Sequence, residues 1–140
     1  MRWASAGLLV LALFAGCEAE RPKAAGPPDY EACGLPAVHP KTDPAKVPEP
    51  YLLGGDAEVS RTEVEQGRLI ASLSVPYSVN DAFPRFKEAI GETTFEVLQE
   101  DNEGFEAELY LRDGKRLGSL QIRSSTCSDV TIAYLNLPAR

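Results

Sequence analysis

The distribution of proline most constrains how this 140-residue chain can fold. Eight of its eleven prolines lie between residues 18 and 50, and only three follow. Proline has a fixed φ and no backbone N–H to donate, so neither a helix nor a central strand can run through this spacing. We therefore predict an extended, polyproline-like tether over residues 17–50. A globular domain is expected over residues 51–140.

The first 17 residues have the pattern of an export signal. Arg2 precedes an apolar run over residues 8–14, and the small residues Ala15 and Gly16 follow it. This run is about half as long as the roughly 20 apolar residues that a transmembrane helix needs. An ordinary secreted protein and a buried N-terminal helix that ends in Cys17 are the alternatives.

The residues Leu13-Phe14-Ala15-Gly16-Cys17 resemble the lipobox of bacterial lipoproteins, which signal peptidase II cuts before the cysteine. The resemblance implies a signal peptide over residues 1–16 and a mature chain that begins at Cys17, with a diacylglyceryl group and fatty acids such as palmitate on that residue. Two or more acyl chains anchor a protein stably in a bilayer.

The resemblance also implies a place in the cell envelope. In Gram-negative lipoproteins, an Asp directly after the lipidated cysteine commonly signals retention in the inner membrane. This chain has Glu18 at that position, which favours an outer-membrane protein that faces the periplasm. In a Gram-positive organism, the protein would lie on the outer face of the cell membrane.

Cys33 and Cys127 are the two cysteines that remain once this resemblance assigns Cys17 to lipidation. An exported protein meets an oxidising compartment, so we predict a Cys33–Cys127 disulfide. Such a bond would hold the tether from Cys33 to about Thr42 against the domain. The alternative is two separate thiols, one exposed and one buried.

Composition argues against several functional classes. The net charge is −7, from 14 basic and 21 acidic residues, which opposes binding to nucleic acid. One histidine and three cysteines are too few for a zinc ribbon, and we interpret His39 as a solvated tether residue. Motifs for an activated nucleophile or a phosphate-binding loop are also missing. We therefore expect no enzyme, metal site or cofactor.

Residues 51–140 show strand alternation that is interrupted by one helical stretch. A helix is expected at about 80–90, with Ser78 as its N-cap. The order ββαββββ predicts an α+β fold, in which a meandering antiparallel sheet packs against one helix on one face, in two layers. The last strand is apolar on both faces, which indicates a central position. Strands are expected at 57–65, 68–75, 94–99, 105–112, 116–123 and 128–137.

Four phenylalanines, Phe83, Phe86, Phe95 and Phe105, are expected in the core between helix and sheet. Small residues in the same layer would leave room there for an apolar ligand; the candidates are Ala71, Ala82, Ala89, Ala107 and Gly118.

Glu106 and Glu108 point outward from one strand at a spacing that glycosidases also use. A solvated strand face explains them better, and the acidic stretch 100–103 has the character of a solvated turn rather than a calcium loop.

The sequence thus indicates a location more clearly than an activity. We expect a non-catalytic interaction module, anchored to the bilayer through Cys17, that binds another envelope protein. The alternative is a carrier or sensor that binds an apolar ligand between helix and sheet. The binding partner, the oligomeric state and the functional face of the domain do not follow from the sequence.

Overall fold

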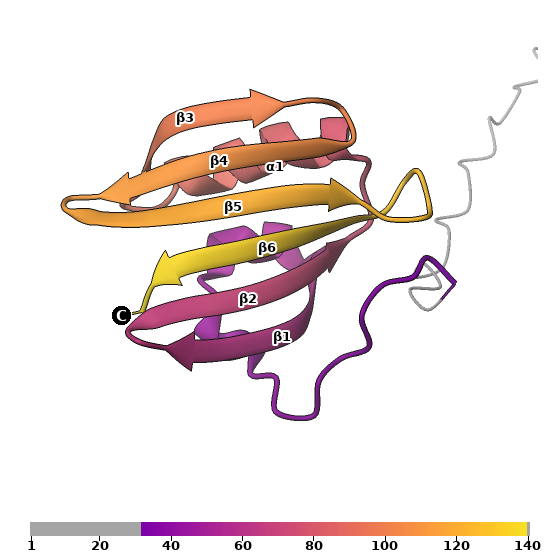
Figure 1. Ribbon diagram of the computed structural model, residues 1–140, viewed down its shortest axis with the longest axis horizontal. Helices are drawn as coiled ribbons and strands as arrows, with labels where there is room; N and C mark the ends of the chain where they lie inside the picture. Colours follow the sequence, from indigo (N-terminus) through magenta and orange to yellow (C-terminus); the bar gives the residue numbers. More distant parts are fainter. Residues whose placement is uncertain (1–31, 140) are drawn as a thin grey trace, which may run out of the picture.

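The computed structural model describes residues 32–139, so the signal sequence and Cys17 lie outside the described residues. Within this range, a six-stranded antiparallel sheet packs against the α-helix and two short 3₁₀ helices (Figure 1). In chain order the elements are η1 (Pro44–Lys46), η2 (Glu49–Gly55), β1 (Glu58–Glu65), β2 (Arg68–Val75), α1 (Val79–Gly91), β3 (Glu96–Asn102), β4 (Glu106–Asp113), β5 (Arg116–Ser124) and β6 (Thr131–Pro138).

The element order confirms the α+β class and the sequence ββαββββ. The strands lie in the order β1-β2-β6-β5-β4-β3, so β6 is central, as its two apolar faces indicated. The prediction of a continuous meander was wrong at β2, which pairs with β6 rather than with β3. The reason is that α1 carries the chain from β2 to the far edge of the sheet, and the meander of β3 to β6 then returns to the centre (Figure 1).

Alternating side chains of the central strands form the core face of the sheet, as the period of two predicted. On β2 the inward residues Leu69, Ala71, Leu73 and Val75 are all buried. On β4 the inward residues are Ala107, Leu109 and Leu111. The outward residues of both strands are largely polar, so one face of the sheet is suited to packing and the other to solvent.

Helix α1 begins at Val79, one residue before the predicted start, and the side chain of Ser78 accepts a hydrogen bond of 3.2 Å from the Asp81 N–H. The predicted N-cap is therefore confirmed. With this start, Pro84 lies inside the helix and offers no N–H to the carbonyl of Asn80. The buried face of the helix, formed by Val79, Ala82, Phe86, Ala89 and Ile90, packs on the sheet.

Three of the four phenylalanines contribute to the core as predicted. Phe86 is fully buried, and Phe83 and Phe95 pack against the core with part of their surface exposed. The prediction for Phe105 was wrong, because this residue lies in the turn before β4 and is 59% exposed. The strand alternation on which that prediction depended begins only at Glu106.

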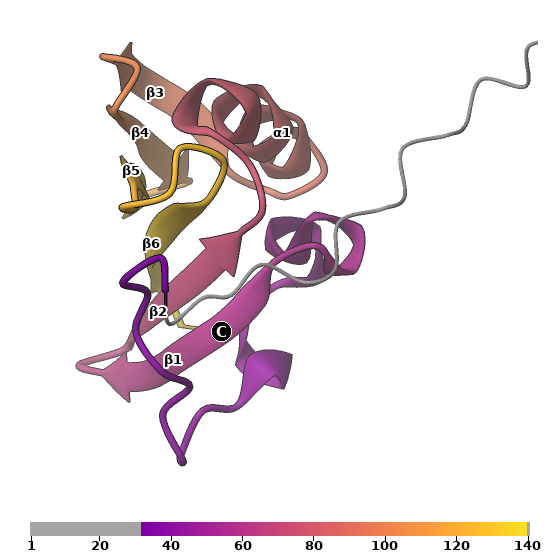
Figure 2. The same ribbon diagram turned by 90° about the vertical axis from the view of Figure 1, so that its right-hand side faces the viewer.

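Residues 33–50, which the sequence assigns to the tether, also contact the domain. Val47 belongs to the main core, and η2, which begins at Glu49, packs on the same side of the sheet as α1 (Figure 2). None of the helices within residues 32–139 is long and apolar enough to cross a membrane.

Candidate functional site

The two faces of the sheet differ in what covers them. Both α1 and η2 lie on one side, and no helix of residues 32–139 covers the opposite side of the central strands (Figure 2). We call this second side the open face. Its central rows are formed by the outward residues of four neighbouring strands: Glu106, Glu108 and Tyr110 of β4, Ser119, Gln121 and Arg123 of β5, Ile132, Tyr134 and Asn136 of β6, and Ile70, Ser72 and Ser74 of β2.

Residues 33–43, which we call the strap, cross one end of the open face and the edge strand β1. Leu35 and Cys33 pack against Val130 and Ile132 at the beginning of β6. Farther along, the N–H of His39 donates to the carbonyl of Ser60 on β1 (2.8 Å), and the N–H of Asp43 donates to the Thr62 hydroxyl (2.7 Å). The strap thus covers part of an edge that would otherwise be free to pair with another strand.

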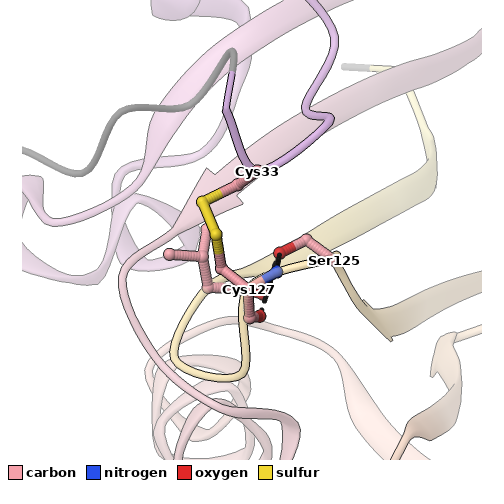
Figure 3. Close-up of a disulfide and its surroundings, with 4 residues drawn as sticks. Cys33, Ser125 and Cys127 are labelled. Carbon is pink, nitrogen blue, oxygen red and sulfur yellow. Dashed lines mark hydrogen bonds between the residues drawn. A yellow bond between two sulfur atoms is a disulfide. The ribbon is translucent and has the colours of Figure 1, made fainter.

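The predicted disulfide joins Cys33 of the strap to Cys127 in the loop between β5 and β6 (Figure 3). The two Cα atoms are 5.2 Å apart, and 94 positions separate them in the sequence. The loop is held from within by Ser125, whose hydroxyl accepts from the Cys127 N–H at 3.1 Å (Figure 3). The bond therefore anchors the strap to a loop that is itself fixed on the end of the sheet.

A hydrogen-bonded network occupies the part of the open face on β4 and β5. The side-chain amide of Gln121 donates to Glu106 at 2.6 Å and to Glu108 at 2.7 Å. Arg123 forms an ion pair of 3.1 Å with Glu106, and the hydroxyl of Tyr110 donates to Glu108 at 3.0 Å. This hydrogen bond and the negative charge of Glu108 raise the pKa of Tyr110 above its usual value.

A shallow groove of about 370 Å³ lies beside this network, over β5 and β6. Tyr110 and Tyr134 are part of its lining, and the small side chain of Ser119 lies on the strand between them. At the border of the groove, the Nε of Arg68 donates a hydrogen bond of 2.5 Å to the Oδ1 of Asn136. The remaining lining is formed by Ile70, Glu108, Leu120, Gln121, Leu135 and Asn136.

A second hollow, of about 420 Å³, lies where η1 approaches the end of the sheet. Apolar side chains from several elements line it, among them Val47, Leu69, Phe95 and Leu137. Deeper in the layer, no room remains at Gly118, because a Cβ atom there would lie 3.0 Å from the Leu137 side chain and 3.5 Å from Phe95. Gly118 therefore leaves no space for a ligand, and the alanines at positions 71, 82 and 107 are buried in the core.

The residues singled out from the sequence are only partly brought together. Cys33 and Cys127 are bonded, whereas Cys17 lies outside the described residues. Glu106 and Glu108 share the amide of Gln121, and His39 lies exposed on the strap with its Nδ1 accepting from the Lys41 N–H. Residues 32–139 contain no group of three or more His, Cys, Asp or Glu side chains that could hold a metal ion.

The sequence did not reveal the groove between Tyr110 and Tyr134. Tyr110 and Tyr134 stand on different strands and lie 24 positions apart in the sequence, so no local pattern links them. Only the pairing register places Tyr110 opposite Ser119, and Tyr134 opposite Gln121 on the other side of the same strand. The chain matches no protein-family model, no curated protein and no solved structure.

Proposed function

We propose that this protein is a non-catalytic binding module of the cell envelope, anchored by lipid at Cys17, whose open face binds another envelope component. The observation that carries this proposal is the open face itself. It has a groove with aromatic and polar lining, and within the described part of the chain neither a helix nor the strap contributes to that lining. The bridged carboxylates of Glu106 and Glu108 fit a structural role, because Gln121 holds both of them and supplies no acid or base.

Because the strap is held against the domain, the connection between the proposed lipid anchor and the domain is short. The disulfide fixes the chain at Cys33, so the free connection runs from Cys17 to that residue rather than to residue 50. In an extended, polyproline-like conformation, this stretch would reach about 50 Å. The net negative charge would keep the domain away from anionic headgroups.

Anchoring is tested with Cys17→Ser in the full-length protein. We expect this variant to leave the membrane fraction, because the acyl chains have no other attachment in the proposal. Glu18→Gln is the matched control and should remain in the membrane fraction. If Cys17→Ser also stays there and resists extraction with salt, lipid anchoring at this residue is wrong.

Binding through the open face is tested by placing a photoreactive side chain at position 119, in the groove, or at position 88, on the exposed surface of α1. The full-length protein is irradiated in the intact envelope, and the crosslinked species are identified by mass spectrometry. We expect a discrete product at Ser119 that Glu88 does not give. Identical products at both positions would overturn the proposal.

A carrier or sensor for an apolar ligand is the second candidate function. The apolar hollow beside η1 favours it, because Val47, Phe95 and Leu137 there reach the interface between the 3₁₀ helices and the sheet. An apolar ligand that is retained through purification and detected by native mass spectrometry would support this candidate.

A further inference from the structure

We propose that the groove between Tyr110 and Tyr134 binds a neutral oligosaccharide chain. This inference rests on the proposed function, because it names the ligand class for the same open face. It is argued from the rings, the unused hydrogen-bonding groups and the charges that line the groove.

The rings of Tyr110 and Tyr134 lie on the open face and are partly exposed to solvent. Tyr110 is 45% exposed and Tyr134 is 38% exposed, although both stand in the middle of paired strands. One strand, β5, separates them, which corresponds to about 10 Å across a sheet. A tyrosine ring offers an apolar surface with little side-chain entropy to lose, and the C–H face of a sugar ring is its natural counterpart.

Several neutral polar groups of the groove have no hydrogen bond to the rest of residues 32–139. They are the hydroxyls of Ser119 and Tyr134, the side-chain N–H groups of Asn136 and the side-chain oxygen of Gln121. This set contains both donors and acceptors. Sugar hydroxyls also donate and accept, so they match such a set without any charge on the ligand.

These groups are held in place before a ligand arrives. Glu108 receives hydrogen bonds from Gln121 and Tyr110, and Arg68 donates to the side chain and the backbone carbonyl of Asn136. Fixed side chains lose less conformational freedom on binding, which favours affinity for a small and weakly interacting ligand.

Charge argues against an anionic ligand. Glu108 lies in the groove, and Asp101, Glu103 and Glu106 line a neighbouring hollow. Three arginines of the neighbouring strands are already engaged, Arg68 with Asn136, Arg112 with Glu96 and Arg123 with Glu106. A nucleic acid, a phosphate polymer or an acidic polysaccharide would therefore be repelled.

The position of the groove argues against an extended peptide. The groove lies over β5 and β6, whose backbone groups pair with neighbouring strands on both sides. A peptide could not add a strand there, so its own N–H and C=O groups would have to be satisfied by a few side chains. A ligand whose polar groups are hydroxyls has no such requirement.

The test uses oxidised protein of residues 18–140 and two soluble probes, cellopentaose and chitopentaose, with binding followed by calorimetry and by NMR shifts of β5 and β6 amides. We expect at least one probe to bind, and Tyr134→Ala to weaken binding at least tenfold. Tyr110→Ala provides a second groove variant should the first not fold. Phe105→Ala removes a 59% exposed ring outside the groove and should change affinity less than twofold.

Several results would overturn the inference. They are no binding of either sugar at millimolar concentration, equal losses in Tyr134→Ala and Phe105→Ala, or binding of decalysine to the same strands in place of sugar. The crosslinking experiment distinguishes an error in the ligand class from an error in the proposed function. A discrete product at position 119 without sugar binding overturns the ligand class alone, whereas identical products at positions 119 and 88 overturn both.

Discussion

Among the glycines of residues 32–139, Gly118 has the least room for a side chain. It is buried on β5, where an added Cβ would lie 3.0 Å from the Leu137 side chain and 3.2 Å from the backbone carbonyl of Asn136. The leucine has some freedom to move, but the backbone of the central strand does not. We expect Gly118→Ala to destabilise the domain by about 1–3 kcal/mol, measured by urea unfolding.

Gly91 provides the matched control for this substitution. It is the last residue of α1, and nothing lies within 4 Å of its added Cβ. We expect Gly91→Ala to be neutral or to stabilise the domain by up to about 1 kcal/mol. Equal effects of the two substitutions would contradict the close packing described at Gly118.

Tyr77 gives the domain a pH-dependent contact. Its hydroxyl donates to the carboxylate of Asp56, and Arg85 lies over its ring at 4.1 Å from the centroid. The hydrogen bond to Asp56, followed by partial burial and the Asp56 charge, raises the pKa of Tyr77. Because the folded state favours the neutral phenol, this contribution is complete below the usual tyrosine pKa and is lost as the pH rises through the folded value.

We therefore expect Tyr77→Phe to lower the free energy of unfolding at neutral pH, by less than about 1 kcal/mol for an exposed contact. The difference between wild type and variant should shrink in alkaline solution above about pH 10. Urea unfolding of both proteins from neutral to alkaline pH measures it. A difference that stays constant over this range would show that the hydroxyl contact does not stabilise the domain.

At the scale of the elements, the strands could be predicted because their signal is local. Alternation in 68–75 and 105–112 depends on which face of each strand is buried, and β4 follows it closely. On β2 the alternation is lost after Ala71, because the outward residues Ser72 and Ser74 are also buried. Errors occur where a turn interrupts this pattern, as at Phe105. The two-residue turns also differ in backbone conformation: at the β4–β5 turn only Gly114 has positive φ, whereas both Gln66 and Gly67 have it in the β1–β2 hairpin.

Helix α1 begins earlier than Pro84 would favour. A start at Val79 buries an apolar side chain in the core, and Ser78 caps the helix. The cost is the missing hydrogen bond to Asn80. We expect Pro84→Ala to stabilise the domain by about 1–3 kcal/mol, measured by thermal and urea unfolding. A loss of stability would mean that the proline ring contributes through packing or through restriction of the unfolded chain.

At the scale of the molecule, sequence reasoning reached the element order but not the neighbours of each strand. The pairing of β2 with β6 joins segments about 60 residues apart, and such a register has no local signature. The groove between Tyr110 and Tyr134 was missed for the same reason. The disulfide was predictable because it depended on cysteine number and compartment rather than on geometry.

The Cys33–Cys127 bond should contribute strongly to stability, because it closes a separation of 94 residues and fixes the strap. Removing such a bond typically costs about 2–5 kcal/mol. We expect reductant to lower the melting temperature of the wild type, and the double variant Cys33→Ser, Cys127→Ser to melt at that lower temperature with or without reductant. An unchanged melt in which two thiols titrate would contradict this role.

We infer that side chains fill the layer between α1 and the sheet, and that ligands therefore bind on the open face. A native mass spectrum of residues 18–140, purified from an oxidising periplasm, tests this most directly. The expected mass is that of the chain with one disulfide and no ligand. A reproducible additional mass that matches an apolar molecule and leaves on unfolding would contradict the account and establish a carrier.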